Sequence, residues 1–219
     1  MAVKAKPGDN VGTIAIRKPN REHVFVEIRG ESPLIVHAWS SDAIAEMLAK
    51  QMGTAVSGPR PKKDPEKAFA ESLYFMPGSS IMDPKPRFAF KAIAFKCAMV
   101  RVCKGMPGLT MTDARLMFFV MGHKDHEWVE IEGTPRNRQD MVRLSGIDRK
   151  PDIRFRGEFP QWTAILRIGY NADATNLESM VNLVAQAGCT IGVGERRADT
   201  EGNNFGQWEV TGYGVPKNA

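Results

Sequence analysis

The sequence has few cysteines and no long apolar run. Cys97, Cys103 and Cys189 are odd in number and form no CxxC pair, which excludes a disulfide framework. No stretch approaches the roughly 20 apolar residues that cross a bilayer. The first residues also lack the apolar segment of a signal peptide. We therefore expect a cytoplasmic protein with reduced thiols and no membrane partner.

Motifs of common catalytic and cofactor sites are lacking as well. The chain shows no Walker loop, no Ser-His-Asp order, no paired carboxylates and no GxGxxG fingerprint. His123 and His126 have the spacing of two metal ligands, but zinc needs about four ligands and no cysteine is near. A surface turn is the favoured interpretation of this pair. We expect no metal, no cofactor and no enzymatic activity.

The composition is that of a folded protein. With 42% hydrophobic and 25% charged residues in 219, a single globular domain over residues 1–219 is expected. Within it, residues 1–21 are predicted to be an N-terminal arm and residues 38–86 an inserted segment. The net charge of +5 is a mild indication of a polyanionic partner.

Hydrophobic periodicity predicts six principal elements. Apolar residues alternate in four segments, which are predicted strands at 23–28, 127–132, 161–170 and 206–211. Helical spacing predicts helices at 88–104 and 175–188, the second starting at a capping box from Thr175 to Glu178. The order β-α-β-β-α-β is typical of an α+β, ferredoxin-like fold, with an antiparallel sheet and both helices on one face. RNA-recognition modules share this arrangement and bind on the other face.

Two long excursions interrupt this pattern. Residues 30–87 follow the first strand and contain predicted helices at 41–51 and 65–73. Residues 133–157 separate the middle strands and are expected to form an extended hairpin. Residues 110–121 fit either a short helix or a strand. Long connections of this kind are usually functional or mobile.

The link between the last helix and the last strand carries the sharpest motif. Gly192 and Gly194 would let the backbone approach a phosphate, and Arg196 and Arg197 would add charge-assisted hydrogen bonds. A flexible connection with a bulge is the alternative.

Basic residues gather in two further places. One is the Pro/Gly-rich loop with Arg60, Lys62 and Lys63. The other is the segment 136–156, whose seven cations fit phosphate contacts or, alternatively, a solvated hairpin with local ion pairs. These seven are Arg136, Arg138, Arg143, Arg149, Lys150, Arg154 and Arg156. Trp39 and Tyr74, which have polar neighbours, are the best candidates for stacking on bases.

Three segments carry a family resemblance. The Gly-rich link, the strand ending in SPLIVH at residues 32–37 and the segment FKAIAFK at residues 90–96 resemble the RAMP superfamily, the RNA-binding Cas subunits of CRISPR complexes. The resemblance implies that Lys91 and Lys96 lie near RNA and that residues 38–86 form a thumb-like insertion. It also implies Cas subunits as possible partners and head-to-tail assembly of copies along the strand. The chain is also similar to small phage-encoded proteins, which act in the host cytoplasm.

We therefore expect a protein that binds single-stranded nucleic acid with little sequence preference. The sequence leaves RNA and DNA open. One alternative is a metal-independent endoribonuclease of the same fold, with His37 or His23 as the base. Another is an inhibitor or interaction protein that mimics a Cas subunit.

Overall fold

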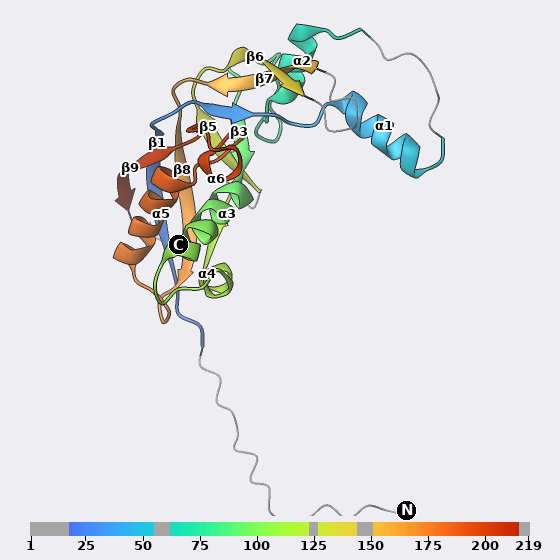
Figure 1. The fold of residues 1–219 in the computed structure, drawn as a ribbon. Helices are drawn as coiled ribbons and strands as arrows, with labels where there is room; N and C mark the ends of the chain where they lie inside the picture. The colour runs from blue at the N-terminus through green and yellow to red at the C-terminus, as the bar shows by residue number, and fades with distance from the viewer. Residues whose placement is uncertain (1–17, 55–61, 123–126, 144–150, 215–219) are drawn as a thin grey trace, which may run out of the picture.

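The computed structural model describes residues 18–54, 62–122, 127–143 and 151–214 (Figure 1). The strands are β1 (Arg21–Gly30), β2 (Leu34–Val36), β3 (Phe88–Lys91), β4 (Phe118–Met121), β5 (Trp128–Glu132), β6 (Arg136–Arg143), β7 (Pro151–Phe159), β8 (Thr163–Asn171) and β9 (Trp208–Gly214). The helices are α1 (Ser41–Gln51), α2 (Pro65–Ser72), α3 (Ala92–Val102), α4 (Met111–Met117), α5 (Leu177–Thr190) and α6 (Ala198–Glu201), with a 3-10 turn at Cys103–Gly105.

The main sheet has the strand order β3-β5-β8-β1-β9, and β4 also pairs with β8. β1 lies antiparallel between β8 and β9. Along the chain α3 follows β3, and α5 follows β8 on the way to β9. The two helices contact each other and lie on one face of the sheet (Figure 1). This is the predicted ferredoxin-like α+β fold, extended at one edge by β3.

Alternation along the strands produces the core. Val24, Val26 and Ile28 point to the helix face and are buried, as are Leu166 and Ile168 on the paired strand β8. Each such side chain contributes about 1.5–3 kcal/mol when it leaves water. The residues between them face the other side of the sheet, so one layer of helices is enough to cover the core.

Three local predictions need correction. Residues 88–91 were predicted to open a helix, but they form β3, which pairs with β5. Their apolar run is compatible with the period of a helix and with that of a strand. Pairing with the edge of β5 makes it a strand. Residues 110–121 hold both alternatives in sequence, α4 and then β4. At α5 the cap is Asn176, not Thr175, since the Asn176 side chain accepts the bond from the Ser179 amide.

The predicted hairpin between the middle strands is present as β6 and β7. Together with β2 it forms a separate three-stranded sheet in the order β2-β7-β6, above the main sheet in Figure 1. α2 packs on β7 so closely that a Cβ on Gly157 would lie 2.4 Å from a Leu73 methyl carbon.

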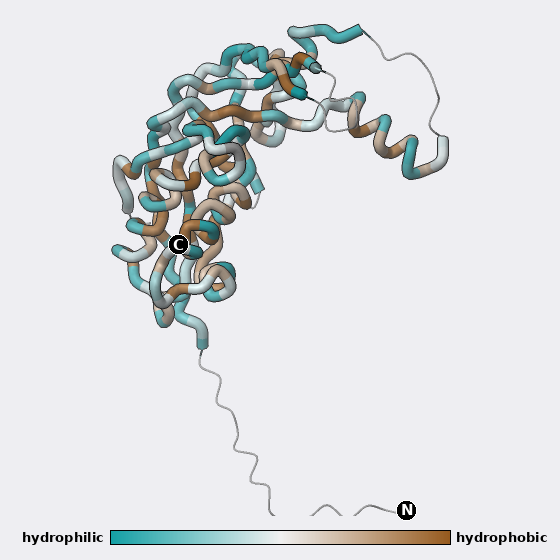
Figure 2. The backbone as a smooth tube through the Cα atoms, viewed as in Figure 1, coloured by the Kyte–Doolittle hydropathy of each residue, from teal (hydrophilic) through white to brown (hydrophobic). Residues whose placement is uncertain are grey.

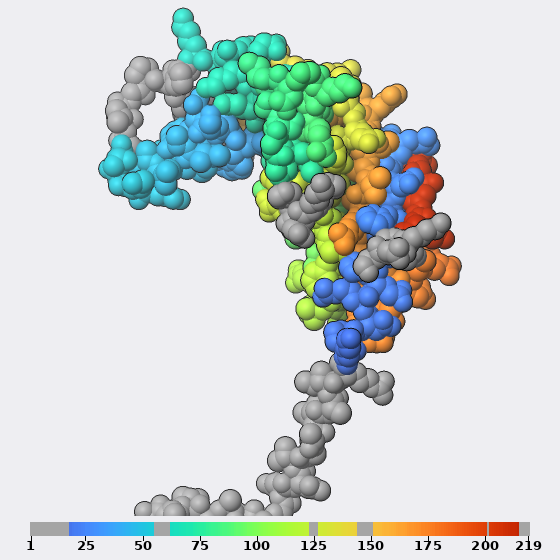
Figure 3. All heavy atoms as spheres, turned by 180° about the vertical axis from the view of Figure 1, so that it is seen from behind, coloured from blue at the N-terminus to red at the C-terminus, as the bar shows by residue number. Residues whose placement is uncertain are grey.

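α1 stands away from the body of the molecule (Figures 1 and 3). It has a proper N-cap, in which the Ser40 side chain accepts from the Ala43 amide, but none of its residues is buried. Figure 2 shows hydrophobic and hydrophilic residues mixed along it. Ile44, Met47 and Leu48 share one apolar face and are exposed. Within the described ranges, no helix combines the length and apolarity needed to cross a membrane.

Candidate nucleic-acid interface

The Gly-rich link after α5 packs against β2. The Glu195 amide donates to the Ile35 carbonyl at 2.9 Å, and a Cβ on Gly194 would lie only 2.4 Å from that oxygen. Gly192 and Gly194 have φ angles of 75° and 85°, which disfavour side chains. The first role of these glycines is therefore a close approach of backbone to backbone.

Arg196 follows in the same left-handed region, with φ 58°. It is the one non-glycine residue with positive φ in the described part of the chain. A left-handed arginine costs about 1–2 kcal/mol and persists when its surroundings hold it.

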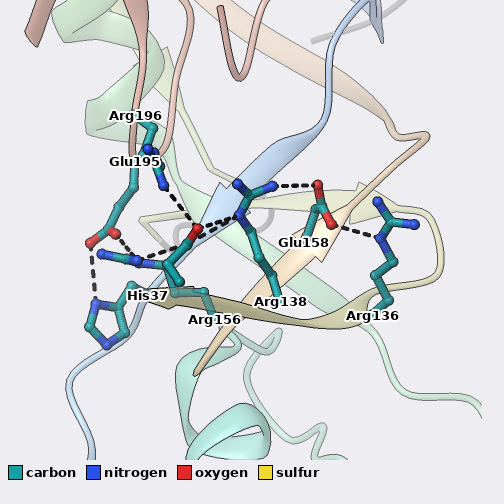
Figure 4. A network of polar contacts seen from close by, with 8 residues as sticks. His37, Arg136, Arg138, Arg156, Glu158, Glu195 and Arg196 are labelled. Atoms are coloured by element: carbon teal, nitrogen blue, oxygen red, sulfur yellow. Dashed lines mark hydrogen bonds and ion pairs between the residues drawn. The ribbon is translucent and has the colours of Figure 1, made fainter. Parts of the chain in front are cut away.

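The Arg196 side chain contacts Asp140 on β6, and two other arginines share this carboxylate. It accepts from Arg196 Nη1 at 2.8 Å, from Arg156 Nη1 at 2.9 Å and from Arg138 Nε at 3.1 Å. Figure 4 labels these three arginines. Arg138 and Arg156 stand directly opposite each other in the β6–β7 register, where two like charges repel. Asp140, only 6% exposed, supplies the charge that lets both arginines remain.

Two more carboxylates extend this network in both directions. Glu158 accepts from Arg136 Nε at 2.7 Å and from Arg138 Nη1 at 3.0 Å. On the other side, Glu195 Oε2 lies 2.5 Å from Arg156 Nε, and Glu195 Oε1 lies 3.2 Å from His37 Nδ1. The network therefore joins the hairpin, the Gly-rich link and the end of β2.

The three carboxyl groups are held in their charged form. Burial raises the pKa of Asp140, but the hydrogen bonds and charges of Arg138 and Arg156 outweigh it and the pKa lies below the ordinary value. The pKa of Glu158 is likewise lowered, because Arg136 and Arg138 outweigh its burial. For Glu195, burial is outweighed by the hydrogen bond of His37 and the charge of Arg156, so its pKa is also lowered.

We call Arg136, Arg138 and Arg196 the anchored arginine row. Their side chains are 65%, 23% and 29% exposed, whereas that of Arg156 is only 7% exposed. A guanidinium has five N–H donors, and the carboxylates use only some of them. Arg136, the most exposed of the three, can therefore present further N–H groups to a phosphate from an orientation that its ion pair with Glu158 fixes. The Arg138 guanidinium also lies 4.9 Å from the centre of the Phe205 ring.

A cleft of about 640 Å³ reaches the network at His37 and Glu195. It lies between the segment of α1 and α2 on one side and β7 on the other, and His37 and Glu195 line it. Trp39 is 66% exposed at this cleft, as base stacking requires. Lys63 pairs with Asp152, and the hydrogen bond of Lys63 together with the charge of Arg154 lowers the pKa of that carboxyl. Lys62 also lines the cleft, as do Asp42, Asp64 and Glu71.

The other predicted site residues lie elsewhere or are engaged. Tyr74 is enclosed by rings: the centres of Phe90 and Trp128 are each 5.6 Å from its own. Its hydroxyl donates to the His37 carbonyl at 3.4 Å. Lys91 lies 5.8 Å from the Trp128 ring centre, which connects it to this group.

Several predicted phosphate ligands are not part of the row. Lys96 donates to the Arg115 carbonyl at 3.0 Å and lies over Phe119, on the side of α4 and β4. Arg197 donates to the Gly194 carbonyl and pairs with Asp199. Arg143 is exposed at the end of β6. Three lie outside the described residues, namely Arg60, Arg149 and Lys150.

The helix-free face of the main sheet is less suited to phosphate. Its cavity of about 930 Å³ is lined by Glu27, Glu130 and Glu132 against one cation, Arg167. Glu130 is bound by Arg87, which leaves two carboxylates without an arginine of their own in this cavity. In the described part of the chain, no group of His, Cys, Asp or Glu is arranged to hold a metal ion. His123 and His126 lie outside it.

Sequence reasoning missed the three anchoring carboxylates. Their signal is the period of two: Arg136, Arg138 and Asp140 share one face of a strand, as do Arg156 and Glu158. Pairing of the two strands places carboxylates beside arginines of the opposite strand. The register of this pairing was not predictable from the sequence.

Comparison with known proteins adds a fold but no family. No family model and no curated protein matches the chain. Among solved structures, it is similar to a chain of the type III-B Cmr-beta complex, determined by cryo-electron microscopy with cognate target RNA bound. The TM-score is 0.50 with 16% identity over 91% of this chain. The match spans 62% of the other chain's length, and at this identity it demonstrates the fold alone.

Proposed function

We propose that this protein binds single-stranded RNA along the anchored arginine row. The observation that carries the proposal is the geometry of Arg136, Arg138 and Arg196, whose side chains stay partly exposed while buried carboxylates fix their orientation. Pre-oriented arginines lose less conformational entropy on binding a phosphate. The similar fold of a chain from an RNA-bound complex supports RNA rather than DNA.

The adjoining cleft is proposed to receive one or more bases. Trp39 offers an exposed ring, and stacking on a ring is sequence-tolerant because every base has a π face. The cations of the cleft are balanced by five lining carboxylates, so the contribution proposed for the cleft is stacking rather than charge. We therefore expect little sequence preference.

We further propose that copies assemble head-to-tail along the RNA, alone or with Cas subunits. The exposed apolar face of α1, with Ile44, Met47 and Leu48, supports a protein partner, because such a face is rarely left in water. A heterologous contact of this kind repeats without closing and gives an open filament. Light scattering on RNAs of increasing length tests this. A mass that stays at one copy on every length contradicts it.

The binding proposal is tested on protein purified from cells. We expect a raised ratio of absorbance at 260 to 280 nm that falls on treatment with ribonuclease but not with deoxyribonuclease. Labelled single-stranded RNA and DNA of the same sequence then give the two affinities. No binding of RNA at about 50 mM salt contradicts the proposal, and tighter binding of DNA contradicts its RNA preference.

A second candidate, endoribonuclease activity, is favoured by one observation. The hydrogen bond that His37 Nδ1 donates to Glu195 leaves Nε2 available, and the ring lines the cleft. Such a base would take the proton of a ribose 2′-hydroxyl, whose oxygen attacks the neighbouring phosphorus. The 5′-oxygen would leave with a proton from water.

Labelled RNA incubated with EDTA distinguishes the two functions. We expect the RNA to stay intact, as binding alone requires. Cleavage that disappears in the His37→Ala variant establishes the second candidate instead.

A further inference from the structure

We propose that Asp140 is the positioning residue of the interface, holding the Gly-rich link in its binding conformation through Arg196. This deepens the proposed function and rests on it for the role in RNA binding. The positioning itself is a property of the free protein and is tested separately.

Three segments meet at this one carboxylate. Arg138 comes from β6, Arg156 from β7 and Arg196 from the Gly-rich link, and each donates to Asp140. With 6% of its surface exposed, Asp140 has little water to replace them. Removing one member of a buried group of charges leaves the remaining charges uncompensated. The three arginine contacts of Asp140 therefore depend on one another.

The backbone of Arg196 shows what the contact achieves. Its φ of 58° is unfavourable for an arginine, yet neighbouring glycines at 192 and 194 occupy the same region without cost. The ion pair of 2.8 Å to Asp140 Oδ1 offsets this local strain. Without the carboxylate, the link would relax and Arg196 would leave the row.

Two backbone hydrogen bonds report on the link. The Val193 amide donates to the Gly206 carbonyl at 3.0 Å and the Glu195 amide to the Ile35 carbonyl at 2.9 Å. Both lie beside Arg196 and neither involves Asp140. Hydrogen exchange at these two amides therefore measures the conformation of the link and not the lost side-chain contact.

The first variant is Asp140→Asn, with Asp152→Asn as the matched control. Asp152 is also on the hairpin and pairs with a cation, Lys63, but does not touch the link. We expect exchange at Val193 and Glu195 to accelerate about tenfold in the Asp140 variant, with unchanged exchange at Val26 and Leu166 in the main sheet. The control should match the parent. Equal exchange in variant and parent overturns the proposal.

Arg196→Met is the second variant, and it tests the same contact if the Asp140→Asn protein does not fold. It removes the same contact and leaves Asp140 with two arginines. Accelerated exchange at Glu195 is again expected, and unchanged exchange contradicts the proposal. RNA affinity should fall about tenfold in each variant, and in the double variant by less than the product of the two losses, because both variants remove the contact between Arg196 and Asp140. Independent, multiplying losses refute a shared role. A parent without RNA affinity refutes the proposed function, while the exchange result still decides the positioning.

Discussion

Arg156 Nε and Glu195 Oε2 lie 2.5 Å apart, which ties the middle of β7 to the Gly-rich link. The Arg156 side chain is only 7% exposed, so its charge depends on Glu195 and Asp140 rather than on water. The carboxylates are therefore as necessary to this interface as the arginines. A search for cationic residues alone would not find the carboxylates that hold these arginines in place.

Trp39 should contribute stacking energy without contributing stability. At 66% exposure it buries little in the free protein, so Trp39→Ala should leave the free energy of unfolding nearly unchanged. RNA binding should weaken by about 1–3 kcal/mol, the range for one base stacked on a ring. Tyr74→Ala is the contrasting variant, because its ring packs on Phe90 and Trp128 and its loss should destabilise the fold. Full RNA affinity in Trp39→Ala would exclude stacking on this residue.

Acid should weaken the fold through the carboxylate network. The pKa values of Asp140, Glu158 and Glu195 lie below ordinary because arginines and His37 outweigh burial. A carboxyl group whose pKa is lower in the folded than in the unfolded chain stabilises the fold at pH values above its unfolded pKa. That unfolded pKa is about 4. That contribution is lost as the pH falls through the folded value.

Urea unfolding at a series of pH values measures this effect. The free energy of unfolding should be steady between about pH 7 and 5.5 and should decline below about pH 4. In Glu158→Gln one titrating group is removed, so the decline should be shallower. An identical pH dependence in parent and variant would show that Glu158 is not linked to stability.

Gly206 should tolerate no side chain, for reasons of space. It has φ 71°, and a Cβ there would lie 1.8 Å from the Val193 carbonyl oxygen. Gly78 has a similar φ of 82° with nothing within 4 Å, so it is a matched control. Gly78→Ala should cost about 1 kcal/mol of unfolding free energy from backbone strain alone, and Gly206→Ala about 3 kcal/mol or more. Equal costs in chemical denaturation would contradict the close packing of the link.

The fold was predictable because its strands alternate and because α3 and α5 carry clear apolar stripes. The failure at residues 88–91 has a physical cause: Phe88, Ala89 and Phe90 are all buried, and a fully buried strand has the same apolar run as a helix. Only the pairing with β5 decides between them. The N-cap at Asn176 differs by one residue from the predicted one, within the usual uncertainty of helix ends.

The site was predictable in its basic residues but not in its geometry. The cluster at 136–156 and the Gly-rich link are adjacent in space, but the sequence does not state that Arg138 faces Arg156 or that Asp140 reaches Arg196. Those contacts depend on hairpin register and on the packing of distant segments. The local ion pairs of the alternative interpretation are present, and the side chains of Arg136 and Arg138 remain partly exposed, as the proposed phosphate contacts require.

The most direct test of the account is the salt dependence of RNA affinity in a variant of the row. Arg136→Ala with Arg138→Ala removes two predicted phosphate contacts, and Arg29→Ala with Lys50→Ala is the control, because each of these cations is exposed and paired with one glutamate away from the row. For single strands, log affinity should change with log salt by about −0.7 per phosphate. We expect the slope of the row variant to be shallower than the parent's by about 1.4, which is two contacts at that increment, and the control to keep the parent's slope. A row variant with the parent's slope and affinity would contradict it.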